Sequence, residues 1–244
     1  MARRGTAGLA AAALTLTLGG AARGEPAAPP GLDVERHRAR PERLGVAELG
    51  LGWLVLPGAD VCAERGAGDC SEGDTSPILR IAPLYRASPL FDVGAGITLG
   101  LIPTTDAPRQ DPPGITRDHS RRYLMVEALA RYYPYLGESF EAWVGPSGGL
   151  VVVGDTYATS SGSDDKALVG PRGVTIRTEG YALGLAAGLT YRLDAHWTLG
   201  GDLRYGGWFL PSEPASDPLG DEASLSGRNA VLSATVNVGY RVPL

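Results

Sequence analysis

The chain has 244 residues and a formal net charge of −5, from 22 basic and 27 acidic side chains. Neutralising nucleic-acid phosphates takes a basic stripe, and the sequence shows none, which argues against a nucleic-acid partner. A content of 43% hydrophobic and 20% charged residues excludes a disordered chain, and 35 glycines disfavour a helical bundle.

Residues 1–24 are predicted to be a cleaved secretory signal peptide. Arg3 and Arg4 give a positive start, residues 7–18 form an apolar run, and the segment ends in small residues. The run is well below the roughly 20 residues that a transmembrane helix needs. Residues 25–44, which four prolines interrupt, are interpreted as a flexible periplasmic leader.

Cys62 and Cys70 are the two cysteines of the chain and lie in a stretch rich in Gly, Asp and Glu. In an oxidising compartment such a pair predicts a disulfide that closes one loop. Free thiols are the alternative. A metal site would need more ligands nearby, and no His is close in sequence, so we expect no metal and no cofactor.

From residue 45 onward the dominant pattern is alternation of apolar and polar residues, which is the signature of a β-strand. It recurs in eight segments: 48–55, 79–86, 91–101, 124–132, 140–152, 181–192, 197–209 and 229–241. The connections alternate between long ones (57–76, 103–120, 155–173, 211–227) and short ones (87–88, 134–138, 194–196). The sequence therefore predicts that residues 45–244 form an all-β, eight-stranded antiparallel up-and-down transmembrane β-barrel. Its short turns would face the periplasm and its long loops the outside.

Alternation alone does not say which face is buried, because a soluble barrel would show the same pattern with the faces reversed. Two features favour an interior that is polar. The polar face is rich in Gly, Ala, Ser and Thr, which suits a narrow lumen. It also carries nearly balanced charges, as buried ions require. The predicted lumen network comprises Glu48, Arg80, Arg86, Asp92, Glu127, Arg131, Glu141, Arg192, Asp202, Arg204 and Arg241.

Aromatic residues collect at the strand ends beside the short turns, as in the interfacial girdle of a membrane barrel. The predicted girdle comprises Tyr85, Phe91, Tyr132, Tyr135, Phe140, Tyr191, Trp197 and Tyr240. A sparser set, Trp53, Tyr181 and Phe209, lies near the long loops.

With these features the chain resembles the small eight-stranded outer-membrane β-barrels of Gram-negative envelopes, of the OmpA transmembrane-domain and OmpX kind. The resemblance covers residues 45–244 and includes a closing alternation at Val236, Val238, Tyr240, Val242 and Leu244, similar to the family's C-terminal assembly signal. It implies an outer-membrane location, with membrane lipids, lipopolysaccharide and the barrel-insertion machinery as partners. The chain departs from the family in ending on Leu244 rather than an aromatic residue. Pro83 and Pro146 also lie inside strands, where they cost ladder bonds unless a bulge accommodates them.

An eight-stranded barrel is just wide enough for its own side chains, so the sequence predicts a plugged lumen and a structural or surface-interaction role. A small pore and a soluble periplasmic barrel that binds an apolar ligand are the alternatives without catalysis. A lipid-A-modifying enzyme is the catalytic alternative. Its candidate residues are Asp118, His119 and Ser120, with possible partners Ser160, Ser161 and Asp164. Neighbouring residues on a strand point in different directions, so the first three form no relay among themselves. We expect no catalytic site, and we expect His119 and His196 to be exposed in loops.

Two of the long connections are acidic. Their carboxylates are either solvated or bind divalent cations or a cationic partner. They are Asp60, Glu64, Asp69, Glu72 and Asp74 in the first connection, and Glu213, Asp217, Asp221 and Glu222 in the last.

Overall fold

The computed structural model describes residues 43–62, 70–106, 117–159, 173–218 and 220–244. The predicted signal peptide and nearly all of the predicted leader lie outside these ranges. The described residues contain strands, turns and bends, and no helix among them is long and apolar enough to span a membrane.

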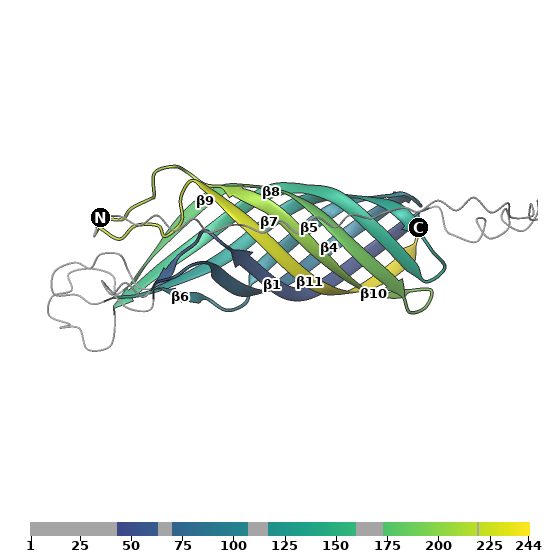
Figure 1. The fold of residues 1–244 in the computed structure, drawn as a ribbon, viewed down its shortest axis with the longest axis horizontal. Helices are drawn as coiled ribbons and strands as arrows, with labels where there is room; N and C mark the ends of the chain where they lie inside the picture. The colour runs from purple at the N-terminus through teal and green to yellow at the C-terminus, as the bar shows by residue number, and fades with distance from the viewer. Residues whose placement is uncertain (1–42, 63–69, 107–116, 160–172, 219) are drawn as a thin grey trace, which may run out of the picture. The chain divides into compact units, whose positions relative to one another are not determined.

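Eight long antiparallel strands form a closed ring, which confirms the predicted fold class (Figure 1). Around the ring each strand pairs with the next in chain order, and the last pairs with the first. The strands are β1 (Leu44–Leu56), β4 (Asp74–Ser88), β5 (Phe91–Gly100), β7 (Arg117–Leu136), β8 (Phe140–Thr159), β9 (Gly173–Arg192), β10 (Trp197–Phe209) and β11 (Arg228–Pro243).

The ring closes where β1 meets β11, in a register that runs from Leu44↔Pro243 to Val55↔Leu232. Leu44, which the sequence assigns to the leader, is the first residue of β1. The Leu244 N–H donates to the Arg43 carbonyl at 3.2 Å, so both ends of the barrel sequence lie at the short-turn end.

Three short strands lie outside the ring of eight. β6 (Thr104–Asp106) pairs with the beginning of β7 and continues the line of β5, which pairs with the same strand further on. β2 (Val61–Cys62) and β3 (Cys70–Ser71) form a small hairpin, and the Cys62–Cys70 disulfide predicted from the sequence joins them.

Long and short connections alternate as predicted, but the strands reach further into the outer segments than expected. β4 begins at Asp74, β7 begins at Arg117 and β8 ends at Thr159. The predicted loop boundaries at 76, 120 and 155 were therefore wrong. The reason is physical: Asp74, Arg117, His119 and Asp155, which were assigned to loops, point into the barrel, where they have polar partners.

The short turn between β9 and β10 is held by one side chain. The Asp194 carboxylate accepts the N–H groups of His196 and Trp197, both at 2.7 Å. These two donors stabilise the charged form and lower the pKa of Asp194. The turn contact is therefore complete above the ordinary pKa of an aspartate and is lost in acid.

The apolar face of the wall points outward and the charged face inward. Leu183, Leu185 and Val236 are 60%, 68% and 63% exposed, whereas Glu127 and Arg204 are 4% and 8% exposed. The reversed arrangement of a soluble barrel with an apolar interior is wrong for this chain.

Pro83 and Pro146 lie in regular register and not at bulges. Pro83 pairs with Ala47 in β1, and Pro146 pairs with Leu185 in β9. On the other side of each proline the ladder lapses for two or more residues and then resumes in the same register. Proline has no backbone N–H, so the ladder hydrogen bond that it cannot donate falls on the side of this gap. The bulges lie elsewhere, between Arg86 and Ser88 and around Pro134.

Because successive residues of β9 face opposite sides of the wall, cysteines placed at positions 185 and 186 should differ sharply in their reactivity toward a thiol reagent. Leu185→Cys should react with a lipophilic thiol reagent in the folded, detergent-solubilised protein, because residue 185 is 68% exposed. Ala186→Cys should react only after unfolding, because residue 186 is 7% exposed. The native cysteines add no background, since both are in the disulfide. Equal labelling of the two folded variants would contradict the inward and outward assignment.

Candidate functional site

The interior of the barrel is the candidate site, and its side chains form four layers along the strands. From the short-turn end outward these are two charged layers, one apolar layer and one polar cluster at the outer mouth.

The layer nearest the short turns is organised around Glu141 of β8. Its carboxylate accepts from Arg86 at 3.1 Å, Arg192 at 2.9 Å and Arg241 at 2.7 Å. Arg86 also contacts Asp92 at 2.8 Å and lies 4.1 Å from the centre of the Tyr133 ring. Three arginines face two carboxylates here, Glu141 and Asp92, so the layer is net positive, and Glu141 contacts all three guanidinium groups.

The second charged layer joins strands on opposite sides of the ring. Asp202 of β10 pairs with Arg80 of β4 at 3.3 Å and with Arg204 at 3.2 Å, and Arg204 also pairs with Glu127 of β7. Asp202 further accepts from Thr235 at 2.7 Å and Asn237 at 2.6 Å. The carboxylate thus has polar partners on three strands, as a buried ion needs.

Next to this layer Arg131 and Glu48 form a bidentate pair, at 2.7 and 2.6 Å, and the Arg131 guanidinium lies 4.0 Å from the centre of the Trp143 ring. Of the eleven residues predicted for the lumen network, nine are buried. Glu48 and Arg192 keep side-chain exposures of 11% and 25%. Each of the eleven has a partner of opposite charge within the set.

Above the charges lies an apolar layer that the sequence analysis missed. Trp208 of β10 is 1% exposed and its ring centre lies 5.3 Å from that of Tyr123. The residues packed around it are Leu54, Leu56, Ile78, Val151, Val153, Leu210, Leu225 and Val231. A cavity bordered by Arg80, Glu127 and Trp208 has a volume of about 40 Å³. That is room for roughly two or three water molecules and not for a channel.

The outer mouth holds a polar cluster around His119, which is 2% exposed. The expectation of an exposed loop histidine was wrong for His119, because β7 extends outward and turns this side chain inside. Its Nε2 lies 2.7 Å from Asp155 of β8, and its ring stacks on Tyr157 at 4.4 Å. His196, in the turn after β9, is exposed as expected.

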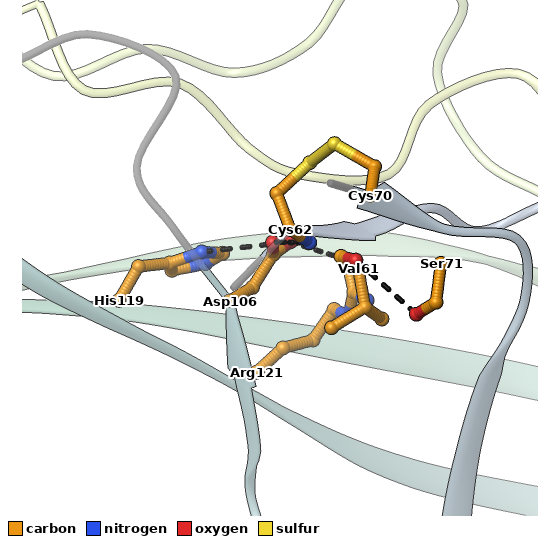
Figure 2. The surroundings of a disulfide bond; sticks show 7 residues. All are labelled: Val61, Cys62, Cys70, Ser71, Asp106, His119 and Arg121. Atoms are coloured by element: carbon orange, nitrogen blue, oxygen red, sulfur yellow. Dashed lines mark hydrogen bonds and ion pairs between the residues drawn. A yellow bond between two sulfur atoms is a disulfide. The ribbon is translucent and has the colours of Figure 1, made fainter. Parts of the chain in front are cut away.

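Asp106 of β6 connects this cluster to the disulfide hairpin (Figure 2). Its carboxylate accepts the Cys62 N–H at 2.8 Å and the Arg121 guanidinium at 3.4 Å, and lies 3.8 Å from His119 Nδ1. Arg121 also binds Asp74 at 3.0 Å. The Asp106 carboxylate therefore links the disulfide hairpin to the barrel wall.

The described parts of the last connection, residues 210–218 and 220–227, fold back over the mouth. Ala223 and Leu225 are 1% and 5% exposed, and Ser224 donates from both N–H and Oγ to Asp155, at 3.1 and 2.5 Å. Arg117 pairs with Asp221 of the same segment. Burial raises the pKa of Asp221, and Arg117 lowers it in part. Asp155 therefore joins His119 of the wall to the segment that covers the mouth.

This arrangement is not a nucleophile relay. The Ser224 hydroxyl donates to Asp155 and not to the His119 imidazole, so the base is not placed to activate it. Asp118 is exposed and Ser120 half-buried, both facing away from the lumen. Ser160, Ser161 and Asp164 lie outside the described residues.

Two acids that the sequence analysis placed in acidic loops are internal ion-pair partners. Asp74 is 2% exposed and pairs with Arg121, and Asp221 is 2% exposed and pairs with Arg117. Asp74 also accepts from the Tyr123 hydroxyl. They are therefore not available to bridge cations at the surface. Glu64 and Asp69 lie outside the described residues.

The predicted girdle residues all lie on the outer face beside the short turns, and each is 40–59% exposed. Six of them form cross-strand ring pairs: Phe91 with Tyr132 at 5.2 Å, Phe140 with Tyr191 at 5.4 Å, and Trp197 with Tyr240 at 5.0 Å.

Comparison with known proteins gives similarity in structure only. No family model matches the chain, and no curated protein sequence matches it. A major outer membrane protein of Thermus thermophilus is similar with a TM-score of 0.48 and 14% identity, over 82% of this chain and 99% of that one. Neisserial surface protein A gives 0.46 and 13%, over 82% and 97%. The outer membrane protease OmpT of Escherichia coli gives 0.42 and 10%, over 84% and 97%.

The Glu141 layer predicts a large stability effect from one neutral substitution. Glu141→Gln removes the shared counter-charge of three buried or partly buried guanidinium groups, so the unfolding free energy should fall by about 3–5 kcal/mol. Urea titration of the detergent-folded protein measures this. Glu213→Gln, at an exposed residue of the last connection, is the control and should change stability by less than about 0.5 kcal/mol. A similarly small effect at Glu141 would contradict the proposed dependence.

Asp155 is predicted to hold the covering segment closed. Asp155→Ala removes both acceptors of Ser224, so the Ser224 amide should exchange hydrogen faster by at least tenfold, while the amides of β10 and β11 keep their protection. Thr156→Ala, on the outer face of the same strand, should leave exchange at Ser224 unchanged. Slow exchange in the Asp155 variant would show that the segment's other contacts, such as the Arg117–Asp221 pair and the packing of Leu225, are sufficient to hold it closed.

Proposed function

We propose that this chain is a Gram-negative outer-membrane β-barrel protein with a structural or surface-interaction role, and that its lumen does not conduct. The observation that carries the proposal is the combination of an outward apolar wall with a lumen filled by paired charges. The signal peptide predicted over residues 1–24 supplies the export that such a location requires.

The wall supports insertion into a bilayer. A closed ring pairs its edge strands with each other and so leaves no open edge facing lipid. Leu, Val, Ile and aromatic side chains cover the outer face, and the aromatic pairs lie at the short-turn boundary, where amphipathic rings favour the headgroup region. Apolar area of this extent would drive aggregation in water.

The filled lumen argues against a pore. An ion that crosses would have to disrupt the Glu141 and Asp202 networks, lose part of its hydration and then pass the closely packed side chains around Trp208. The described residues of the last connection also contact Asp155 and Arg117 at the outer mouth. Among the described residues, the outer end of the barrel is formed by parts of this segment and by the β2–β3 pair with its disulfide.

Membrane fractionation and bilayer recording test the proposal. The protein should co-fractionate with the outer membrane and migrate faster on a gel before heating than after it. It should also give no conductance steps in a planar bilayer. Steps that persist with purified folded protein would favour the pore, and recovery in the soluble periplasmic fraction would refute membrane insertion.

The enzymatic alternative has a separate test. Lipid A from cells with the wild-type protein, with His119→Ala and without the protein should give the same mass spectrum, because His119 is buried and contacts no free nucleophile among the described residues. A mass change that depends on His119 would establish the enzyme and overturn the structural role.

A further inference from the structure

We propose that the outer face of β7, β8 and β9 binds the phosphate group of an anionic lipid between Arg122 and Arg177. This inference rests on the proposed membrane location and adds a lipid class and a site to it. The site lies on the outside of the wall, separate from the lumen and the mouth.

Strand register brings the two arginines to one level of the sheet. Arg122 of β7 pairs with Gly154 of β8, and Gly154 pairs with Arg177 of β9. Both arginines are exposed and belong to the outward set of their strands. Two strand spacings separate their backbones by roughly 10 Å, so both long side chains reach a single group placed over the glycine.

Gly154 leaves space for that group. A Cβ built on Gly154 meets no atom within 4 Å, whereas the neighbouring strands carry side chains at the same level. The position is therefore an open notch between the two strands that carry Arg122 and Arg177.

Neither guanidinium has a counter-ion in the described part of the chain. The ion pairs found there use Arg80, Arg86, Arg117, Arg121, Arg131, Arg192, Arg204 and Arg241. Almost every arginine that points inward is paired, and these two outward ones are not. Two forked donors around a notch match the geometry of a phosphate group.

The surroundings point to a lipid and not to a free anion. One level further out, the face carries the hydroxyls of Ser120, Thr156 and Thr175, and the last two are 3.3 Å apart. One level further in, it carries Leu124 and Val152, followed by Val126 and Leu150. A cationic level beside apolar levels matches the phosphate and acyl parts of an anionic lipid, and the hydroxyl level lies on the side away from the acyl chains, where polar headgroup atoms lie.

One acid opposes the site. Glu179 lies two residues after Arg177 on the same face, at the level of Leu124 and Val152. It is exposed and has no ion-pair partner among the described residues. Its charge reduces the attraction for a phosphate, so removing it should tighten binding. A purely structural role of Arg122 and Arg177 would not predict this.

The test measures binding of bis-phosphorylated lipid A to the purified full chain in detergent, by native mass spectrometry. Arg122→Ala and Arg177→Ala should each weaken binding about tenfold, the value of one charge-assisted interaction. Gly154→Val should weaken binding by filling the notch, and Glu179→Gln should strengthen it severalfold. Arg228→Ala is the matched control, because Arg228 is exposed on β11 over the Phe209 ring at 5.5 Å, and it should have no effect.

Several outcomes would overturn the site. An equal loss with Arg228→Ala would mean that general positive charge attracts the lipid. Equal binding of dephosphorylated lipid A would remove the phosphate from the interaction. Competition by millimolar inorganic phosphate would indicate a free-anion site. Heat-modifiability of each variant shows that it is folded, and loss of the site with normal outer-membrane fractionation would leave the proposed function intact.

Discussion

The lumen of an eight-stranded barrel has no room for bulk water, so every charge inside it needs a counter-charge from the wall. In this chain that requirement is met mainly between strands, with Arg204 and Asp202 also paired along β10. Asp202 of β10 holds Arg80 of β4, Arg131 of β7 holds Glu48 of β1, and Glu141 of β8 receives arginines from three strands. These contacts fix the diameter and the register of the wall, because a shift of one residue would turn every buried charge toward lipid.

The lining of the lumen changes along the barrel from charged to apolar and then to polar side chains. The two charged layers lie toward the short turns, and the apolar layer around Trp208 separates them from the mouth cluster. The mouth cluster has a different role, because its groups bind the segments that cover the opening. Asp106 holds the disulfide hairpin and Asp155 holds residues 210–227. The carboxylates at the mouth thus tie described parts of the first and last connections to the barrel wall.

The strands, their order and the facing of most side chains were predictable, because alternation records which face each residue occupies. The apolar layer was not. In Trp53–Leu54–Val55 and in Leu150–Val151–Val152–Val153 both faces are apolar, so alternation disappears and carries no information on facing. The mouth cluster was missed for another reason: a charged outer segment looks like loop. Counting alternate residues outward from Glu127 would have placed Arg121, His119 and Arg117 inside. Their partners come from other strands or, for Arg117, from the last connection, and the sequence pattern of β7 does not reveal them.

The pairing of β1 with β11 has a consequence for biogenesis. The first and last strands of the barrel are the farthest apart in the chain, so the ring stays open until the final strand has been synthesised and delivered. Until then two strand edges are unsatisfied, and the intermediate is prone to aggregation. Contacts of such long range also form slowly. A chain that lost its last strand would expose the β1 and β10 edges, and quality-control proteolysis would remove it before it reached its destination.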